Sequence, residues 1–235
     1  MKTFSLFLLI TVTFFSFKLN AQTELRTWVD ENGKSISENV FNEKWRTDIY
    51  SRWDYILKEA PNSSDSIKKS LRIAKLIPAY TASTTNHKKW VEFLSTETNT
   101  PIKTNNTIVI SFMHKDDLCG GTRNHNTTPD KKLRAYKNFY HPIFKKLKKK
   151  NPEVTPFMFF EKGVFLNTSL QETPFFSDEK NVLKRGIFNI PALCGSYAII
   201  KPNNQILVIN GESRIDYIIE EYLHNEEYWN TFFKQ

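Results

Sequence analysis

The chain has few cysteines and few glycines, and both counts limit the class of protein to which it can belong. It contains 2 cysteines and 7 glycines in 235 residues. Two cysteines are too few for a disulfide-built scaffold or for the paired ligand couples of a zinc ribbon. With 40% hydrophobic and 14% aromatic residues, the chain is neither low-complexity nor disordered. The composition indicates a globular protein.

Several catalytic motifs are also missing. The sequence has no His-Glu-x-x-His, no glycine-rich phosphate loop, no Ser-His-Asp order and no internal repeat. Hydrolase and nucleotide-binding functions therefore have no support in the sequence.

The first residues have the form of a secretory signal peptide. Lys2 supplies a positive start, an apolar run extends from Phe4 to Phe17, and the small residue Ala21 suits a signal peptidase. This run is shorter than the roughly 20 apolar residues of a membrane-spanning helix. We therefore expect residues 1–21 to be removed and the mature protein to be periplasmic or extracellular, without a transmembrane anchor.

The chain carries an excess of positive charge. Its formal net charge is +8, which falls to +6 when Lys2 and Lys18 leave with the signal peptide. The densest basic run, residues 145–150, lies where a helix is expected to end, and lysines there complement the helix dipole. The run is therefore interpreted as a solvated helix end, and no nucleic-acid partner is expected.

From residue 107 onward, the hydrophobic pattern predicts alternating strands and helices. The predicted elements are a strand at 107–112, a helix at 131–150, a strand at 155–160, a helix from about 177 to 187, strands at 196–201 and 205–210, and a last helix opening at Ser213. The order is β-α-β-α-β-β-α. A helical crossover makes the first two strands parallel, and a tight turn makes the last two antiparallel.

A cysteine follows the first of these strands and precedes the long helix, and residues 197–208 have the form of an apolar strand, a polar turn and a second strand. This arrangement resembles the thioredoxin-like superfamily, in particular its exported thioredoxin-like and peroxiredoxin-like members. The resemblance covers residues 107–235 and implies an α/β, three-layer fold around a mixed sheet. It also implies exchange with a protein thiol or disulfide partner, with no cofactor.

The sequence departs from the family at its active-site motif. The family's Cys-x-x-Cys stands here as Cys119-Gly120-Gly121-Thr122, so Thr122 replaces the resolving cysteine. What remains is a monothiol pattern, Cys-Gly-x-Ser/Thr, in which a helix N-terminus favours the thiolate.

The resemblance also predicts two neighbouring thiols. It places Gly195 at the family's cis-proline position, unless Pro191 fills that role, and so sets Cys194 against Cys119. Cys119 would be the attacking thiol and Cys194 its unusual partner, with Thr122 in the catalytic motif. The residues expected beside a bound partner are Gly120, Gly121 and Gly195.

Two functions stay open at this point. The first is an exported thiol–disulfide oxidoreductase, and the second is a non-catalytic envelope protein that binds a partner and uses the bridge as a structural staple. A minor third reading is copper handling by the two cysteines with His114 or His125, which are ligands suited to Cu(I). The family pattern for copper is incomplete, so no metal site is expected.

Residues 22–106 lie outside the resemblance. Their pattern predicts a hairpin at 25–36, a helix from Ser37 to Ala60, a second helix at 64–77 and a third around 87–94. The predicted organisation is thus a signal peptide at 1–21, a hairpin and helical extension at 22–106, and a thioredoxin-like domain at 107–235.

Overall fold

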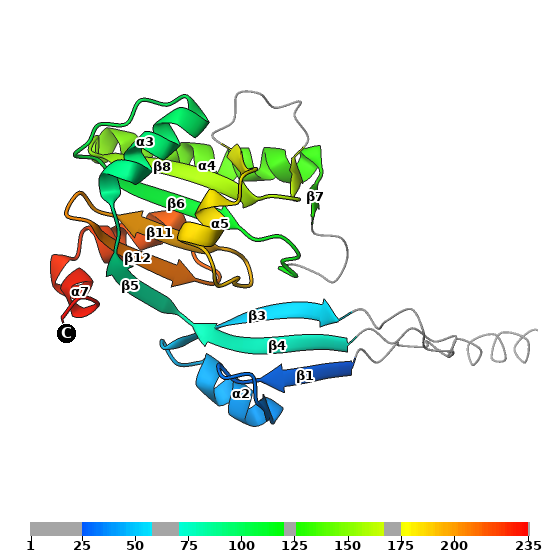
Figure 1. The fold of residues 1–235 in the computed structure, drawn as a ribbon. Helices are drawn as coiled ribbons and strands as arrows, with labels where there is room; N and C mark the ends of the chain where they lie inside the picture. The colour runs from blue at the N-terminus through cyan, green and yellow to red at the C-terminus, as the bar shows by residue number, and fades with distance from the viewer. Residues whose placement is uncertain (1–24, 58–70, 120–125, 167–174, 235) are drawn as a thin grey trace, which may run out of the picture.

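The computed structural model describes residues 25–57, 71–119, 126–166 and 175–234. Within them the chain is a mixed α/β protein with two main sheets, which we call the small and the large sheet. Strand β4 (Leu71–Pro78) of the small sheet runs almost directly into β5 (Tyr80–Thr84) of the large sheet. Figure 1 shows the small sheet below the large one, with this passage between them. The predicted signal peptide lies outside the described residues.

The small sheet has the strand order β2-β1-β4-β3. Its strands are β1 (Leu25–Val29), β2 (Ser35–Ile36), β3 (Tyr50–Leu57) and β4. The predicted hairpin at 25–36 is confirmed, because β1 and β2 pair antiparallel. Helix α2 (Glu38–Trp45) begins at the predicted residue, since the Ser37 side chain accepts a hydrogen bond from the amide of Val40. Its Phe41 covers one face of the sheet.

Two of the helices predicted before residue 107 are wrong over the described residues. The first ends at Trp45 instead of Ala60, and β3 follows it. The apolar spacing fits a helix, but the aromatic and β-branched residues of 50–57 favour a strand when a partner strand is present. That partner is β4, which pairs with β3 along its whole length and occupies part of the second predicted helix. The third, α3 (His87–Thr98), is confirmed, so the described part of 22–106 is not mainly helical.

The large sheet has the strand order β10-β8-β6-β11-β12-β5. The strands not yet given are β6 (Thr107–Met113), β8 (Val154–Glu161), β10 (Phe175–Asp178), β11 (Ser196–Ile200) and β12 (Gln205–Asn210). β6, β8 and β10 run parallel, whereas β11 is antiparallel to both β6 and β12, and β5 is antiparallel to β12. The predicted strands are confirmed. β10 and the edge position of β5 were not predicted.

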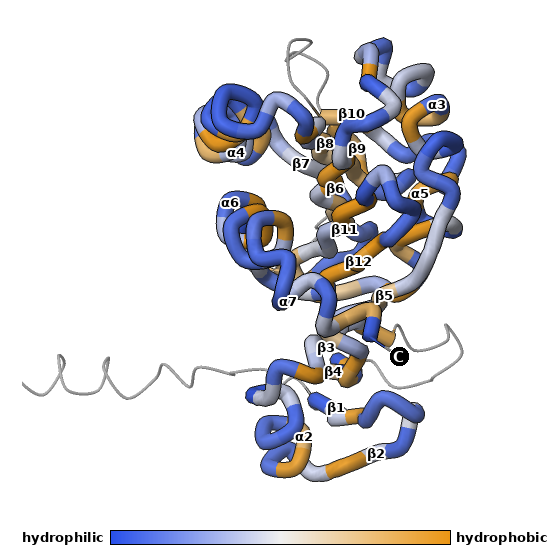
Figure 2. Tube along the Cα trace, turned by 90° about the vertical axis from the view of Figure 1, so that its left-hand side faces the viewer, coloured by the Kyte–Doolittle hydropathy of each residue, from blue (hydrophilic) through white to orange (hydrophobic). Residues whose placement is uncertain are grey.

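Helices cover both faces of the large sheet, as Figure 2 shows. One face carries α4 (Asp130–Lys150), α6 (Ile215–Ile218), a π-helix (Ile219–Leu223) and α7 (Glu226–Thr231), and the other carries α3 and α5 (Val182–Gly186). β6, β8 and β11 are almost completely buried, which explains their continuous apolar runs. The lysines of 148–150 form the last turn of α4, as predicted.

A third, short sheet lies beside the large one. It pairs β7 (Thr127–Thr128) with β9 (Phe165–Leu166) in parallel. None of the helices in the described parts of the chain is long and apolar enough to span a membrane.

The two main sheets are joined by backbone hydrogen bonds as well as by the chain itself. The amide of Ala79 donates to the carbonyl of Ile49 (2.9 Å), and the carbonyl of Ala79 accepts from the amide of Asn210 (2.8 Å). Gly211, with φ +108°, leaves no space for a Cβ atom because the Ser51 side chain fills that position. The end of β12 is therefore fixed against β3 and β4.

Candidate functional site

Cys119 and Cys194 form a disulfide at one end of the large sheet. Cys119 follows β6, and Cys194 lies in the turn before β11. Because β6 and β11 are antiparallel neighbours, the last residues of β6 and the first residues of β11 lie at the same end of the sheet. The Cα atoms are 4.8 Å apart, within the roughly 4.4–6.8 Å that a disulfide requires. The predicted adjacency of the two cysteines is confirmed.

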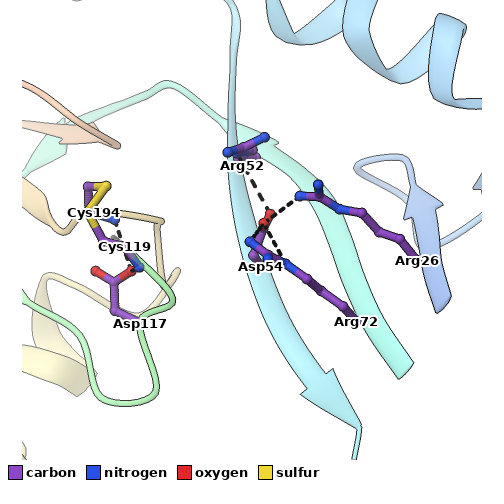
Figure 3. Close-up of polar contacts among 7 residues, drawn as sticks. All are labelled: Arg26, Arg52, Asp54, Arg72, Asp117, Cys119 and Cys194. Carbon is purple, nitrogen blue, oxygen red and sulfur yellow. Dashed lines mark hydrogen bonds and ion pairs between the residues drawn. A yellow bond between two sulfur atoms is a disulfide. The ribbon is translucent and has the colours of Figure 1, made fainter. Parts of the chain in front are cut away.

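A buried carboxylate binds the backbone of both cysteines. Oδ1 of Asp117 accepts hydrogen bonds from the amide of Cys119 (2.9 Å) and from the amide of Cys194 (3.1 Å). Figure 3 shows the Asp117 side chain directed at this pair. The Asp117 side chain is buried. This carboxylate therefore connects the two halves of the disulfide through their backbone.

The turn that carries Cys194 is conformationally demanding. Cys194 has φ +66° and Gly195 has φ +91°, a region that residues with a side chain seldom adopt. A Cβ atom on Gly195 would lie 2.7 Å from the carbonyl oxygen of Phe112, so only glycine fits. No peptide bond among the described residues is cis, so neither Gly195 nor Pro191 supplies a cis-proline equivalent.

The same turn touches the small sheet. The amide of Leu193 donates to the carbonyl of Arg52 in β3 (2.9 Å), and the amide of Gly211 donates to the carbonyl of Gly195 (3.0 Å). The cysteine pair therefore lies where both sheets and the end of β12 converge.

Part of the predicted site lies outside the described residues. Along the chain, β7 and Pro129 separate Cys119 from α4, which begins at Asp130. Cys119 therefore does not belong to the first turn of α4, although Lys132 of this helix and Cys119 line one small cavity. Gly120, Gly121 and Thr122 are not described, and neither is His125, so their predicted roles remain predictions.

A small cavity adjoins Cys119. Its volume of about 30 Å³ suits a single water-sized molecule. Asp117, Lys132 and Tyr136 are among its lining residues. Burial raises the pKa of Tyr136 to about 12, with smaller contributions from Tyr140 and Asp117. Both cysteines are half-buried.

His114 lines the same cavity and belongs to a buried hydrogen-bond chain that the sequence did not reveal. Ser196 donates to Oδ1 of Asn210 (2.9 Å), which uses its one hydroxyl hydrogen. Nε2 of His114 lies 2.9 Å from this hydroxyl and must therefore be its donor. In the neutral ring Nδ1 is then an acceptor, and it lies 3.4 Å from Nζ of Lys184.

Burial lowers the pKa of His114, and the neighbouring charges act in both directions. Glu161, 3.6 Å from Nδ1, raises the pKa, whereas the ammonium of Lys184 lowers it. Because burial dominates, His114 is neutral near pH 7. Both ring nitrogens face protein groups, and no cluster of three His, Cys, Asp or Glu side chains in the described segments could hold a metal ion.

A second charged group lies close to the cysteine turn and was also missed. Asp54 of β3 is completely buried, and Arg26, Arg52 and Arg72 surround it (Figure 3). Arg26 and Arg72 lie opposite each other on β1 and β4, and Asp54 follows Arg52 on the same face of β3. Only the strand pairing brings these residues together, so no sequence motif marks them.

Comparisons with protein-family models, with curated proteins and with solved structures find no match to this chain.

Proposed function

We propose that the chain is an exported protein of thioredoxin-like fold that performs thiol–disulfide exchange through Cys119 and Cys194. The observation that carries the proposal is the disulfide itself: it is half-buried and joins the ends of two central strands. In an oxidising compartment such a pair is expected to bridge or to exchange.

The strand order supports the fold assignment. The four strands predicted from the sequence lie in the order β8-β6-β11-β12, with the first pair parallel and the later pairs antiparallel. Helices lie on both faces. The absence of a cysteine-bearing helix start and of a cis peptide bond in the described residues separates this chain from the family pattern.

The exchange reaction can be written with the two cysteines alone. The Cys119 thiolate attacks a partner disulfide, which breaks, releases one partner thiolate and leaves a mixed disulfide. The Cys194 thiolate then attacks Cys119, restores the internal bond and releases the second partner thiolate. The partner gains two electrons and the chain loses them. The Asp117 carboxylate, which is buried against the backbone of both cysteines, is the proposed acceptor of a thiol proton.

A structural staple is the second candidate, and a specific observation favours it. The Asp117 carboxylate binds the amide of Cys194, and the turn with Cys194 is fixed to β3 by the bond from Leu193 to Arg52. A structural bond of this kind would hold the two sheets together in an envelope protein without turnover.

Redox titration distinguishes the two functions. The mature protein is equilibrated with glutathione buffers, and its thiols are counted by alkylation and mass spectrometry. A bond that is reduced well above about −300 mV, together with exchange with a model disulfide, supports the oxidoreductase. A bond that resists reduction at that potential supports the staple. Mass analysis of the protein exported by its own cells tests the expected N-terminus at Gln22.

A further inference from the structure

Arg52 is an unusual cation among the residues that the structure describes. Its side chain is only 20% exposed, and its guanidinium lies over the ring of Trp45, 4.0 Å from the ring centre. A guanidinium carries five N–H donors, yet within the described residues those of Arg52 make no hydrogen bond, and the buried Nε atom is unsatisfied. The nearest acceptor is Oδ1 of Asp54, 3.7 Å from Nε.

Asp54 is already engaged by other donors. Its Oδ2 atom accepts hydrogen bonds from Arg26 (2.7 Å) and from Arg72 (2.6 Å). Three guanidinium groups thus lie around the Asp54 carboxylate in the small sheet. Burial lowers the pKa of Arg52; the charges of Asp54 and Glu212 act against this, and those of Arg26 and Arg72 act with it.

The guanidinium groups are held in place before any ligand arrives. Arg26 lies over the ring of Trp28 at 4.3 Å, as Arg52 lies over Trp45. Such stacking restricts a long side chain and leaves its N–H edges for a planar or tetrahedral anion. Arg26 is 30% exposed, so the pair is accessible from solvent.

We propose that Arg52 and Arg26 form a binding site for one oxyanion, the phosphate of a small phosphomonoester or a small-molecule carboxylate. The paired N–H groups of a guanidinium match the spacing of two oxygen atoms in either group. The anion would accept hydrogen bonds from the terminal N–H groups of Arg52, which make none within the described residues. The site lies next to the cysteine turn, because Leu193 binds the carbonyl of Arg52, but it does not depend on thiol chemistry.

Titration with inorganic phosphate tests the proposal. The mature, oxidised protein is titrated with phosphate, acetate or chloride at matched ionic strength. Tryptophan fluorescence is followed because Trp28 and Trp45 carry the two guanidinium groups. We expect saturable one-site binding of phosphate, of acetate, or of both, and none of chloride. The comparison of phosphate with acetate identifies the preferred anion.

Three variants complete the test. Arg52→Gln should weaken binding by about tenfold or more, because charge-assisted hydrogen bonds are lost. Arg52→Lys keeps the charge and should still weaken binding, because an ammonium group cannot form the bidentate hydrogen bonds of a guanidinium. Arg46→Gln removes an exposed charge from the same part of the chain and should bind as the wild type does. No binding by the folded wild type, or equal loss in the Arg46 and Arg52 variants, overturns the proposal.

Discussion

The carboxylate of Asp117 accepts a hydrogen bond from the amide of Cys194, which lies 77 positions further along the chain. The same oxygen accepts from the amide of Cys119. One carboxylate thus fixes both halves of the disulfide from the backbone side.

Replacement of Asp117 by asparagine should make the reduced cysteines more acidic. The amide oxygen can still accept the two hydrogen bonds, but the charge that disfavours a thiolate is gone. We expect a lower thiol pKa and faster alkylation of the reduced Asp117→Asn variant at neutral pH, measured by thiolate absorbance and iodoacetamide kinetics. An unchanged or raised thiol pKa would show that the Asp117 charge does not reach the sulfur atoms.

Loss of the disulfide should lower the stability of the oxidised protein markedly. The bond closes a loop with a sequence separation of 75, worth roughly 4 kcal/mol on the chain-entropy model. The Cys119→Ser/Cys194→Ser variant should unfold at lower urea concentration than the oxidised wild type. Addition of reductant should lower the urea midpoint of the wild type and leave that of the variant unchanged. A reductant effect of equal size on both proteins would contradict this assignment.

Replacement of Asp54 by asparagine should destabilise the small sheet. The three arginines would lose their shared carboxylate, and breaking a buried ionic group in this way costs about 3 kcal/mol. Urea unfolding measures the loss. The matched control is Glu92→Gln, because Glu92 forms an exposed pair with Lys88 at 4.0 Å, and such a pair is worth at most about 1 kcal/mol. An equal loss in the free energy of unfolding for the two substitutions would contradict the prediction.

The contact between Gly211 and Ser51 should behave as a coupled pair. Gly211→Ala introduces a methyl group where the Ser51 hydroxyl lies and strains a backbone at φ +108°, so we expect a loss of about 2 kcal/mol or more. Ser51→Ala in the same molecule should recover part of this loss by removing the hydroxyl. A double-mutant cycle by chemical denaturation measures the coupling, and simple additivity would mean that the sheets do not meet there in solution.

His114 should make the protein less stable as the pH falls below about 6.5. Its pKa is lowered in the folded protein, so the unfolded chain binds the proton more tightly and protonation favours unfolding. The stability is therefore complete above the unfolded pKa and declines as the pH falls toward the folded pKa. The pKa of Glu161 is also lowered, but its effect on stability lies below the ordinary glutamate pKa of 4.5.

The His114→Gln variant is the control for this pH dependence. It should be less stable near pH 7 because Gln does not reproduce the ring contacts with Trp53 and Phe112. Its free energy of unfolding should, however, change less between pH 7 and pH 5.5 than that of the wild type. Identical pH slopes for the two proteins would show that another group titrates in this range.

The sequence predicted the central part of the large sheet well. Runs such as 107–112 and 155–160 are apolar on both faces. When a long helix separates two such runs, they are typical of buried parallel strands. The pairing of Cys119 with Cys194 was also predicted, because the resemblance fixed the register of the strand after Cys194.

The small sheet could not be predicted in the same way. The apolar residues of 50–57 satisfy both helical and strand spacing, and only the presence of β4 decides between them. The Arg26, Arg52 and Arg72 group depends on that pairing, as does the contact of Leu193 with β3. Interactions between residues far apart in the chain leave no local signal in its composition or periodicity.

The position of β5 has a consequence for the order in which the molecule is assembled. β5 comes early in the chain but forms the edge of the large sheet by pairing with β12, which comes near the end. During synthesis, residues 80–84 emerge long before residues 205–210, so the nascent strand has no partner while most of the chain is made. An unpaired strand is a site for unwanted association. β5 is thus protected only when β12, near the end of the chain, has been made. A chain truncated before β12 would be a substrate for chaperones or proteases.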